Sequence, residues 1–382
     1  MPIDTRVIKP RMLIAIIVVA VLCLAFANGA NDNFKGVATL FGSGTTDFRR
    51  ALTWATITTL LGSLTAVFLA RTLLKSFTGK GLVDTELAAT IDYGAAVALG
   101  AGLTVLLATR LGMPISTTHS LVGTLIGAGW AAGSAINITK LGSGFLAPLL
   151  FSPFLALGVT VLLYPLLTHA RRRFGVIAET CLCVGGATVE VVPEACSAVT
   201  LRRVEQLSIQ VGDVVTCRNR YQGKMFGIDA GPTLDRLHYV SAGMVSFARG
   251  LNDTPKIAAL LVLAPAIGQF GSVALVGAAI AVGGIISSRR VAETMSQKIT
   301  AMNHGQGFTA NFITSLIVIG ASRLGLPVST THVGCGSLFG IGSVTRQANW
   351  SMIGRILGAW LVTLPLGAAL GALFYWLISG LG

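Results

Sequence analysis

Two ten-residue strings in the chain are nearly identical and place hydroxyl groups beside an imidazole. RLGMPISTTH runs from Arg110 to His119, and RLGLPVSTTH runs from Arg323 to His332. In each string a Ser-Thr-Thr run follows a proline, and the two runs consist of Ser116, Thr117, Thr118 and of Ser329, Thr330, Thr331. Hydroxyl groups donate hydrogen bonds without carrying charge, so the two runs are suited to holding a polar ligand.

A second pair of strings places an aspartate beside an asparagine. GANDNFK covers Gly29 to Lys35, and GLNDTPK covers Gly250 to Lys256. Both fit the frame G-x-N-D-x-x-K, whose polar members are Asn31, Asp32, Lys35 and Asn252, Asp253, Lys256. Each aspartate follows an apolar stretch. An ionisable residue within a membrane span costs about 2.5–3.5 kcal/mol and therefore indicates a functional site.

The composition places this chemistry in a lipid bilayer. Hydrophobic residues make up 53% of the 382 residues and charged residues 11%, whereas about a quarter of a soluble domain is charged. Many apolar stretches approach the roughly 20 residues that cross a bilayer, and we expect ten to twelve spanning or half-spanning segments. The net charge of +13 comes mainly from basic residues at span ends and in one long loop, so no nucleic-acid partner is expected. The expected location is the cell (plasma or inner) membrane, with several passes.

The two motifs occur in the same order twice, which indicates two homologous halves. We assign residues 1–168 to the first membrane repeat, 169–237 to a polar segment and 238–382 to the second membrane repeat. ATVEVV and LSIQVGDVVTCRN are rich in Val, Ile and Thr and favour strands. The expected fold class is an all-α polytopic membrane protein with broken or re-entrant helices and a small β-rich loop domain. The basic residues of this loop favour the cytoplasmic side.

The prolines predict where the hydroxyl groups lie. Pro114 and Pro327 end the preceding helix and suit the entry to the next one, so both Ser-Thr-Thr runs are expected at helix N-termini. A helix N-terminus binds anions through free N–H groups and a partial positive charge, and two facing termini would surround one tetrahedral oxyanion. The alternative is packing between helices, which the duplication disfavours. His119 and His332 either hold the helix start or bind a proton or ligand.

The aspartates suggest how such an anion would be carried. An anion near Asp32 and Asp253 is repelled unless a cation intervenes, and a co-bound Na⁺ or proton would remove the repulsion. Broken helices in paired repeats mark transporter sites, and their carbonyl ends can coordinate Na⁺. These features favour cation-coupled symport. Lys35 and Lys256 share a helix face with each aspartate and are counter-charges, anion contacts or snorkelling side chains.

At these residues the chain resembles the inorganic phosphate transporter (PiT) family. The resemblance rests on GANDNFK, GLNDTPK, PISTTH and PVSTTH, and it covers both membrane halves but not the loop between them. It implies two inverted repeats, about twelve membrane segments, a large cytoplasmic loop, and symport of phosphate with Na⁺ or H⁺ without a cofactor. A homodimer is a further expectation. By this resemblance Asn31, Asn252 and the two Ser-Thr-Thr runs bind phosphate, and the two aspartates couple the cation.

Two departures and one alternative substrate qualify the resemblance. The family frame usually ends in a second asparagine, where this chain has Lys35 and Lys256. A fixed positive charge there would replace a bound Na⁺ or favour coupling to protons. Some relatives carry sulfate, which is also tetrahedral. Phosphate can donate a hydrogen bond to Asp32 or Asp253 and sulfate cannot, which favours phosphate.

Other interpretations rest on single features. The central loop holds Cys181, Cys183, Cys196 and Cys217, whose spacing fits no standard zinc pattern. Reduced thiols are expected in a cytoplasmic loop, and a metal site is the weaker alternative. An ion channel would show uptake independent of a coupling gradient. A membrane hydrolase would use one nucleophile, whereas the repeated Ser-Thr-Thr-His string suits a symmetric binding site, so no enzyme is expected.

Overall fold

The structure, a computed structural model, describes residues 5–177, 180–185, 188–193, 199–204, 208–213 and 225–380. It divides into two compact units, one formed by Met1–Leu162 with Val240–Gly382 and one by Leu163–Tyr239. The first unit joins the two ends of the chain and holds all the sequence motifs described above. The boundaries of the two repeats within it remain a sequence-based prediction.

The first part of the chain is built from helices whose starts are fixed by polar side chains. Asp47 caps the third helix by accepting a hydrogen bond from the backbone N–H of Arg50, and this bond lowers the pKa of the exposed carboxyl. Thr90 caps the sixth helix in the same way. The helices are α1 Thr5–Asp32, α2 Ala38–Gly42, α3 Phe48–Leu69, α4 Arg71–Ser76, α5 Thr85–Ala88, α6 Ile91–Arg110, α7 Thr117–Ala131 and α8 Ala147–Arg173, with a 3-10 turn at Lys35–Val37 and a π-helix at Lys140–Leu146.

The last part of the chain is also helical and carries the second copies of the motifs. One helix carries the second Asn-Asp pair, and a later helix leads into the second Ser-Thr-Thr run. The helices are α10 Ala230–Ala258, α11 Gly268–Ser287, α12 Arg289–Glu293, α13 His304–Arg323, α14 Thr330–Thr345 and α15 Trp350–Ser379, with 3-10 turns at Ala259–Leu263 and Pro265–Ile267 and a π-helix at Thr294–Lys298.

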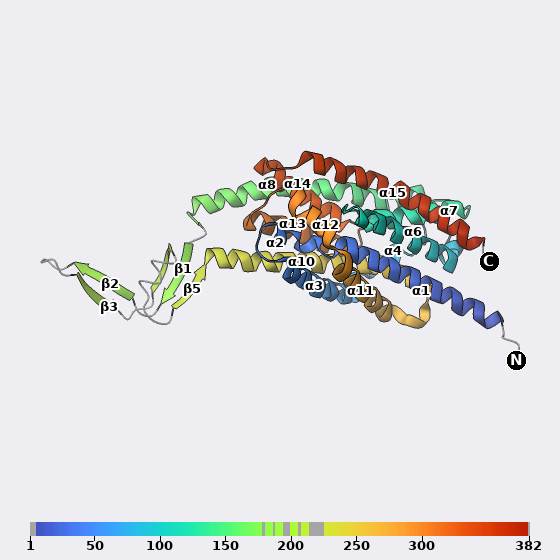
Figure 1. The fold of residues 1–382 in the computed structure, drawn as a ribbon, viewed down its shortest axis with the longest axis horizontal. Helices are drawn as coiled ribbons and strands as arrows, with labels where there is room; N and C mark the ends of the chain where they lie inside the picture. The colour runs from blue at the N-terminus through green and yellow to red at the C-terminus, as the bar shows by residue number, and fades with distance from the viewer. Residues whose placement is uncertain are drawn as a thin grey trace. The chain divides into compact units, whose positions relative to one another are not determined.

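The helices of the first unit pack through apolar faces and glycines. Helix α1 packs against α6 and α11, and α15 packs against α6 and α7 (Figure 1). A Cβ on Gly29 of α1 would lie 1.9 Å from the Ile280 carbonyl oxygen of α11, so this glycine allows the two backbones to approach. Burying the apolar faces of these helices positions the polar motifs inside the unit.

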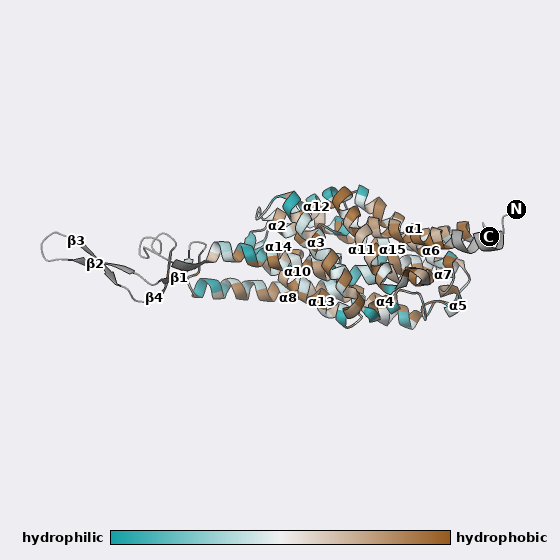
Figure 2. Cartoon of the chain, turned by 90° about the horizontal axis from the view of Figure 1, so that it is seen from below, coloured by the Kyte–Doolittle hydropathy of each residue, from teal (hydrophilic) through white to brown (hydrophobic). Residues whose placement is uncertain are grey.

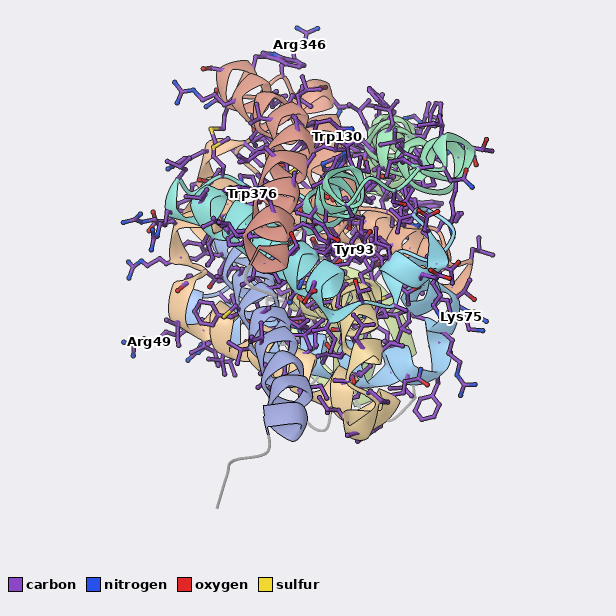
Figure 3. All side chains as sticks on the ribbon, turned by 90° about the vertical axis from the view of Figure 1, so that its right-hand side faces the viewer. Arg49, Lys75, Tyr93, Trp130, Arg346 and Trp376 are labelled. Carbon is purple, nitrogen blue, oxygen red and sulfur yellow. The ribbon has the colours of Figure 1, made fainter. Side chains whose placement is uncertain are left out.

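The outer faces of this unit are apolar too. Most residues of its long helices are hydrophobic (Figure 2), and large apolar side chains such as Phe68 and Leu361 are exposed. Arg49, Lys75 and Arg346 project from the rim (Figure 3). Tyr93 is buried, and its hydroxyl donates to the Leu125 carbonyl at 3.0 Å. Apolar outer faces with charge at the rim are typical of helices that contact lipid.

The predicted number of membrane segments is wrong. Among the described residues, six helices are long and apolar enough to cross a membrane: Ile14–Gly42, Phe48–Leu69, Ile91–Arg110, Lys140–Arg173, Pro265–Ser287 and Trp350–Ser379. Helices α7 and α14 have 15 and 16 residues, fewer than the roughly 20 that a span needs. Helices α10 and α13 bury polar side chains, including Arg249 and Asn311. Counting apolar stretches therefore overestimated the spans.

The expected β-rich cytoplasmic domain is also corrected. Helix α8 extends to Arg173 and α10 begins at Ala230, so helix occupies both ends of the predicted loop. The short strands between them form two separate antiparallel sheets, in the orders β4-β1-β5 and β2-β3. Sheets this small bury little apolar surface, and most of the described residues lie in helices. The chain is therefore a predominantly helical protein. Nothing in the described residues places this segment in the cytoplasm. The strands are β1 Thr180–Gly185, β2 Thr188–Pro193, β3 Val199–Val204, β4 Ser208–Asp213 and β5 Met225–Asp229.

Candidate functional site

The two Ser-Thr-Thr runs lie at the starts of two short helices. Ser116 is the N-cap of α7 and accepts a hydrogen bond from the His119 backbone N–H at 3.1 Å. Ser329 is the N-cap of α14 and accepts from the His332 N–H at 3.2 Å. Each serine side chain is occupied as the hydrogen-bond acceptor of a backbone N–H at its helix start. The threonine hydroxyls are therefore the groups available for contacts in the interior.

The two aspartates lie near the ends of long helices. Helix α1 ends at Asp32, and α10 continues past Asp253 to Ala258. Gly29 and Gly250 lie inside these helices, so they do not break them. A Cβ on Gly250 would lie 2.1 Å from the Thr59 carbonyl oxygen, which shows that both glycines of the repeated frame serve close packing.

Lys35 connects the two repeats. Its ammonium group forms a buried ion pair with Asp32 and donates to the Asn31 side-chain oxygen at 2.7 Å. It also donates to the Ile115 carbonyl at 2.8 Å and to the Thr331 hydroxyl of the second repeat at 2.7 Å. Thr331 in turn donates to the same Ile115 carbonyl at 2.8 Å. The lysine of one repeat therefore binds the hydroxyl run of the other.

Lys256 makes three of the four corresponding contacts from the second repeat. Its ammonium nitrogen lies 3.4 Å from a carboxylate oxygen of Asp253 and 2.8 Å from the Val328 carbonyl. It donates to the Thr118 hydroxyl of the first repeat at 2.7 Å, and Thr118 donates to Val328 at 3.4 Å. The two halves thus interlock through one symmetric pattern of contacts.

Asn28 bridges the two aspartates. Its amide nitrogen lies 2.9 Å from a carboxylate oxygen of Asp32, 3.0 Å from the Thr117 hydroxyl and 3.5 Å from a carboxylate oxygen of Asp253. Thr117 also donates to Asp32 at 3.0 Å, and the Thr330 hydroxyl lies 3.5 Å from Asp253. The acidic groups of both repeats therefore belong to one hydrogen-bonded cluster.

Arg249 breaks the symmetry of this cluster. It occupies the position before Gly250, which corresponds to Asn28 before Gly29. Its guanidinium donates to the Asn28 and Asn33 side-chain oxygens, both at 3.1 Å, and its side chain is 1% exposed. Its Nε is buried without a hydrogen-bond partner. The sequence analysis missed Asn28 and Arg249, although an arginine in the apolar stretch VSFARG was a usable signal.

The two asparagines of the frame are held by equivalent side chains. The Asn31 amide donates to the Thr109 hydroxyl at 2.9 Å. In the second repeat the Ser322 hydroxyl donates to the Asn252 side-chain oxygen at 3.2 Å. Thr109 and Ser322 both precede the arginine that opens the RLG strings. These contacts fix each asparagine to the helix that leads into the hydroxyl run.

The two histidines meet beside the cluster. The rings of His119 and His332 lie 4.4 Å apart between centroids, and the His332 ring stacks on Trp360 at 3.7 Å. The Trp360 indole donates to the Pro114 carbonyl at 3.1 Å. The backbone N–H of each histidine donates to the capping serine, and Nδ1 of His119 and Nε2 of His332 are buried without a partner.

The cluster concentrates buried charge. Of the residues that the structure describes, the buried charged side chains are Asp32, Lys35, Arg249, Asp253 and Lys256. By residue type the cluster holds two carboxylates and three basic groups, so its formal charge is one positive unit. A buried unpaired charge is costly unless it is neutralised, so this cluster is suited to receive an anion.

The structure does not test the cysteine prediction. Cys181 and Cys183 lie on strand β1, and Cys196 and Cys217 lie outside the described residues. Within the described part of the chain there is no group of three or more His, Cys, Asp or Glu side chains placed to hold a metal ion. The predicted phosphate-binding and cation-coupling residues, in contrast, all lie in the buried cluster or at the helix starts beside it.

Comparison with known proteins identifies the family. Residues 28–371 match the phosphate transporter family, and the chain therefore belongs to that family. A protein of Pyrococcus abyssi named as a phosphate permease is 28% identical over 94% of this chain and 96% of its own length. A Bacillus subtilis protein named as a low-affinity inorganic phosphate transporter is 24% identical over 96% and 98%.

A solved structure shares the fold. The structure titled the sodium-dependent phosphate transporter superposes with a TM-score of 0.74 at 21% identity, covering 97% of this chain and all of that one. At this identity the likeness concerns the fold alone. Family membership and the six apolar helices together show a membrane-embedded transporter, which confirms the resemblance noted in the sequence.

Proposed function

We propose that this chain carries inorganic phosphate across a cell membrane in symport with a cation, either Na⁺ or H⁺, through one site shared by the two repeats. Family membership supports phosphate as the substrate. A transporter of this kind is a carrier and performs no catalysis. A homodimer and a cytoplasmic position for the central segment remain expectations from the resemblance.

The observation that carries the proposal is that the buried cluster holds three basic side chains but two carboxylates. Arg249 has no carboxylate within ion-pair distance among the described residues, whereas Lys35 and Lys256 each have one. A guanidinium presents several N–H donors in a fixed plane that matches phosphate oxygens. Arg249 is therefore the group whose charge a bound phosphate would neutralise.

The hydroxyl groups supply the remaining donors. Thr117, Thr118 and Thr331 now donate to a carboxylate or a carbonyl inside the cluster. Binding of an anion would exchange these hydrogen bonds for bonds to its oxygens. A protonated phosphate oxygen would donate to Asp32 or Asp253, which a sulfate ion cannot do at neutral pH.

A carrier must also alternate between two arrangements of its repeats, each of which opens the site to one side of the membrane. The bonds from Lys35 to Thr331 and from Lys256 to Thr118 cross between the repeats. We propose that these bonds hold the two repeats together in the arrangement of this structure, and that they open on one side at a time. A cation gradient would then drive phosphate because the aspartates bind the coupling cation in one arrangement more tightly than in the other.

Uptake of radiolabelled phosphate into proteoliposomes tests this function. The measurement is made under an imposed Na⁺ or pH gradient, with excess sulfate as competitor. We expect gradient-dependent uptake that resists sulfate, that Asp32→Asn abolishes and that the exposed control Asp84→Asn retains. Uptake that sulfate abolishes would make the chain a sulfate carrier, and uptake that is indifferent to any gradient would make it a channel.

A further inference from the structure

The ammonium groups of the two buried lysines each lie in a cage of oxygen atoms. Around Lys35 the cage consists of oxygens from Asn31, Asp32, Ile115 and Thr331, and three of them lie 2.7–2.8 Å from the nitrogen. An amide oxygen, a carboxylate, a carbonyl and a hydroxyl form a ligand set that suits a small monovalent cation as well as an ammonium group.

The second cage repeats the carboxylate, carbonyl and hydroxyl of the first, without the amide oxygen. Around Lys256 it consists of oxygens from Asp253, Val328 and Thr118. In both cages the carboxylate lies three residues before the lysine, and the carbonyl belongs to the residue before the capping serine. The hydroxyl in each comes from the third member of the other repeat's Ser-Thr-Thr run. One plan built twice from different helices indicates a cation-holding site in each repeat.

We infer that the ammonium groups of Lys35 and Lys256 are built-in cations that fill cages of oxygen atoms suited to hold free Na⁺. Lys35 is 9% exposed and Lys256 is 1% exposed, so neither ammonium is a solvated surface charge. As long as both cages are filled, Na⁺ has no place among these oxygens. This inference rests on the proposed function. With Na⁺ excluded from both cages, the coupling cation is the proton.

The inference predicts that removing an ammonium group creates a binding site for a free cation. Lys35→Ala leaves the oxygens of the cage in place and frees the space of the side chain. A cation that binds the folded state only will then raise the unfolding temperature. Purified Lys35→Ala is expected to unfold at a higher temperature in sodium chloride or methylammonium chloride than in choline chloride of equal ionic strength.

Four further proteins are measured beside Lys35→Ala for comparison. The wild type and the exposed-lysine variant Lys75→Ala should unfold at the same temperature in all three salts. Asp32→Asn/Lys35→Ala removes the carboxylate of the cage and should lose the response to Na⁺. Lys256→Ala tests the second cage, and it replaces Lys35→Ala if that variant does not fold.

The unfolding temperatures either support or overturn the inference. A specific rise in Na⁺ for either lysine variant, with none for the wild type, supports the inference. A rise of equal size in the wild type overturns it, as does the absence of any response to Na⁺ and methylammonium in both lysine variants. If the wild type takes up no phosphate under any gradient, the proposed function fails, but the unfolding temperatures still decide whether the lysines fill cation sites.

Discussion

At the residue scale, Arg249 determines the charge of the buried cluster. The other four buried charged residues form two ion pairs, and Arg249 donates to the amide oxygens of Asn28 and Asn33 at 3.1 Å and to the Thr59 hydroxyl at 3.4 Å. Amide oxygens stabilise a guanidinium by hydrogen bonding without neutralising it. Its charge is therefore free to attract an anion into the interior of the protein.

Replacing this guanidinium should weaken phosphate binding. Arg249→Gln keeps polar atoms in place but removes the charge, and a hydrogen bond to a charged group contributes about 1.5–3 kcal/mol. We expect the apparent affinity for phosphate to fall about 10- to 100-fold, measured as the KM of uptake in proteoliposomes. Arg49→Gln, at an exposed position, is the control. An unchanged KM in Arg249→Gln would remove Arg249 from the site.

The bonds that cross between the repeats should appear as energetic coupling. Lys35 and Thr331 are in direct contact, and contacting residues couple by about 0.5–3 kcal/mol in double-mutant cycles. Lys35→Gln combined with Thr331→Val should show such coupling in the free energy of unfolding. Lys35→Gln combined with Thr104→Val, whose hydroxyl bonds within α6, should be additive within about 0.5 kcal/mol. Additivity in both cycles would contradict the interlocked arrangement.

At the element scale, glycines determine how closely the helices of the cluster approach. Gly29→Ala would place a Cβ 1.9 Å from the Ile280 carbonyl oxygen, which forces α1 away from α11. Overpacking of this kind costs about 1–3 kcal/mol, so the free energy of unfolding should fall by that amount. Gly358→Ala on α15 meets no atom within 4 Å and should leave stability unchanged or slightly higher. Equal effects of the two substitutions would rule out close packing as the role of Gly29.

The start of α3 should depend on pH through Asp47. Because its pKa is lowered by the bond from the Arg50 N–H, the ionised carboxylate stabilises the folded state above its unfolded pKa of about 3.9. That stabilisation is lost as the pH falls through the folded value. The unfolding temperature of Asp47→Ala should lie below that of the wild type at neutral pH, and the difference should close in acid. A difference that stays constant down to about pH 3 would contradict this role.

The sequence predicted where the helices of the site begin more accurately than it predicted the number of membrane-spanning helices. The prolines correctly indicated that Ser116 and Ser329 begin helices, because Pro has a fixed local effect on the backbone. Length and hydropathy could not show that α10 buries Arg249 or that α7 is too short to span, because both depend on packing against other helices. Nor could the sequence show that Gly29 and Gly250 are packing positions, because that depends on contacts with other helices.

At the scale of the whole molecule, the polar motifs of the two predicted repeats form one hydrogen-bonded cluster. The sequence predicted that the motifs would come together, but it could not show which lysine binds which threonine. That pairing depends on tertiary contacts between helices far apart in the chain. Each repeat supplies its carboxylate and carbonyl to its own lysine and its hydroxyl to the lysine of the other, so neither half completes a site alone.

The number of phosphate ions bound per chain tests this account most directly. Calorimetric titration of the purified wild type with phosphate should give one site per chain. Thr118→Val in the first repeat and Thr331→Val in the second should each weaken that same site. Two phosphate ions per chain, with each substitution affecting a different one, would show that the repeats bind separately and would contradict the shared site.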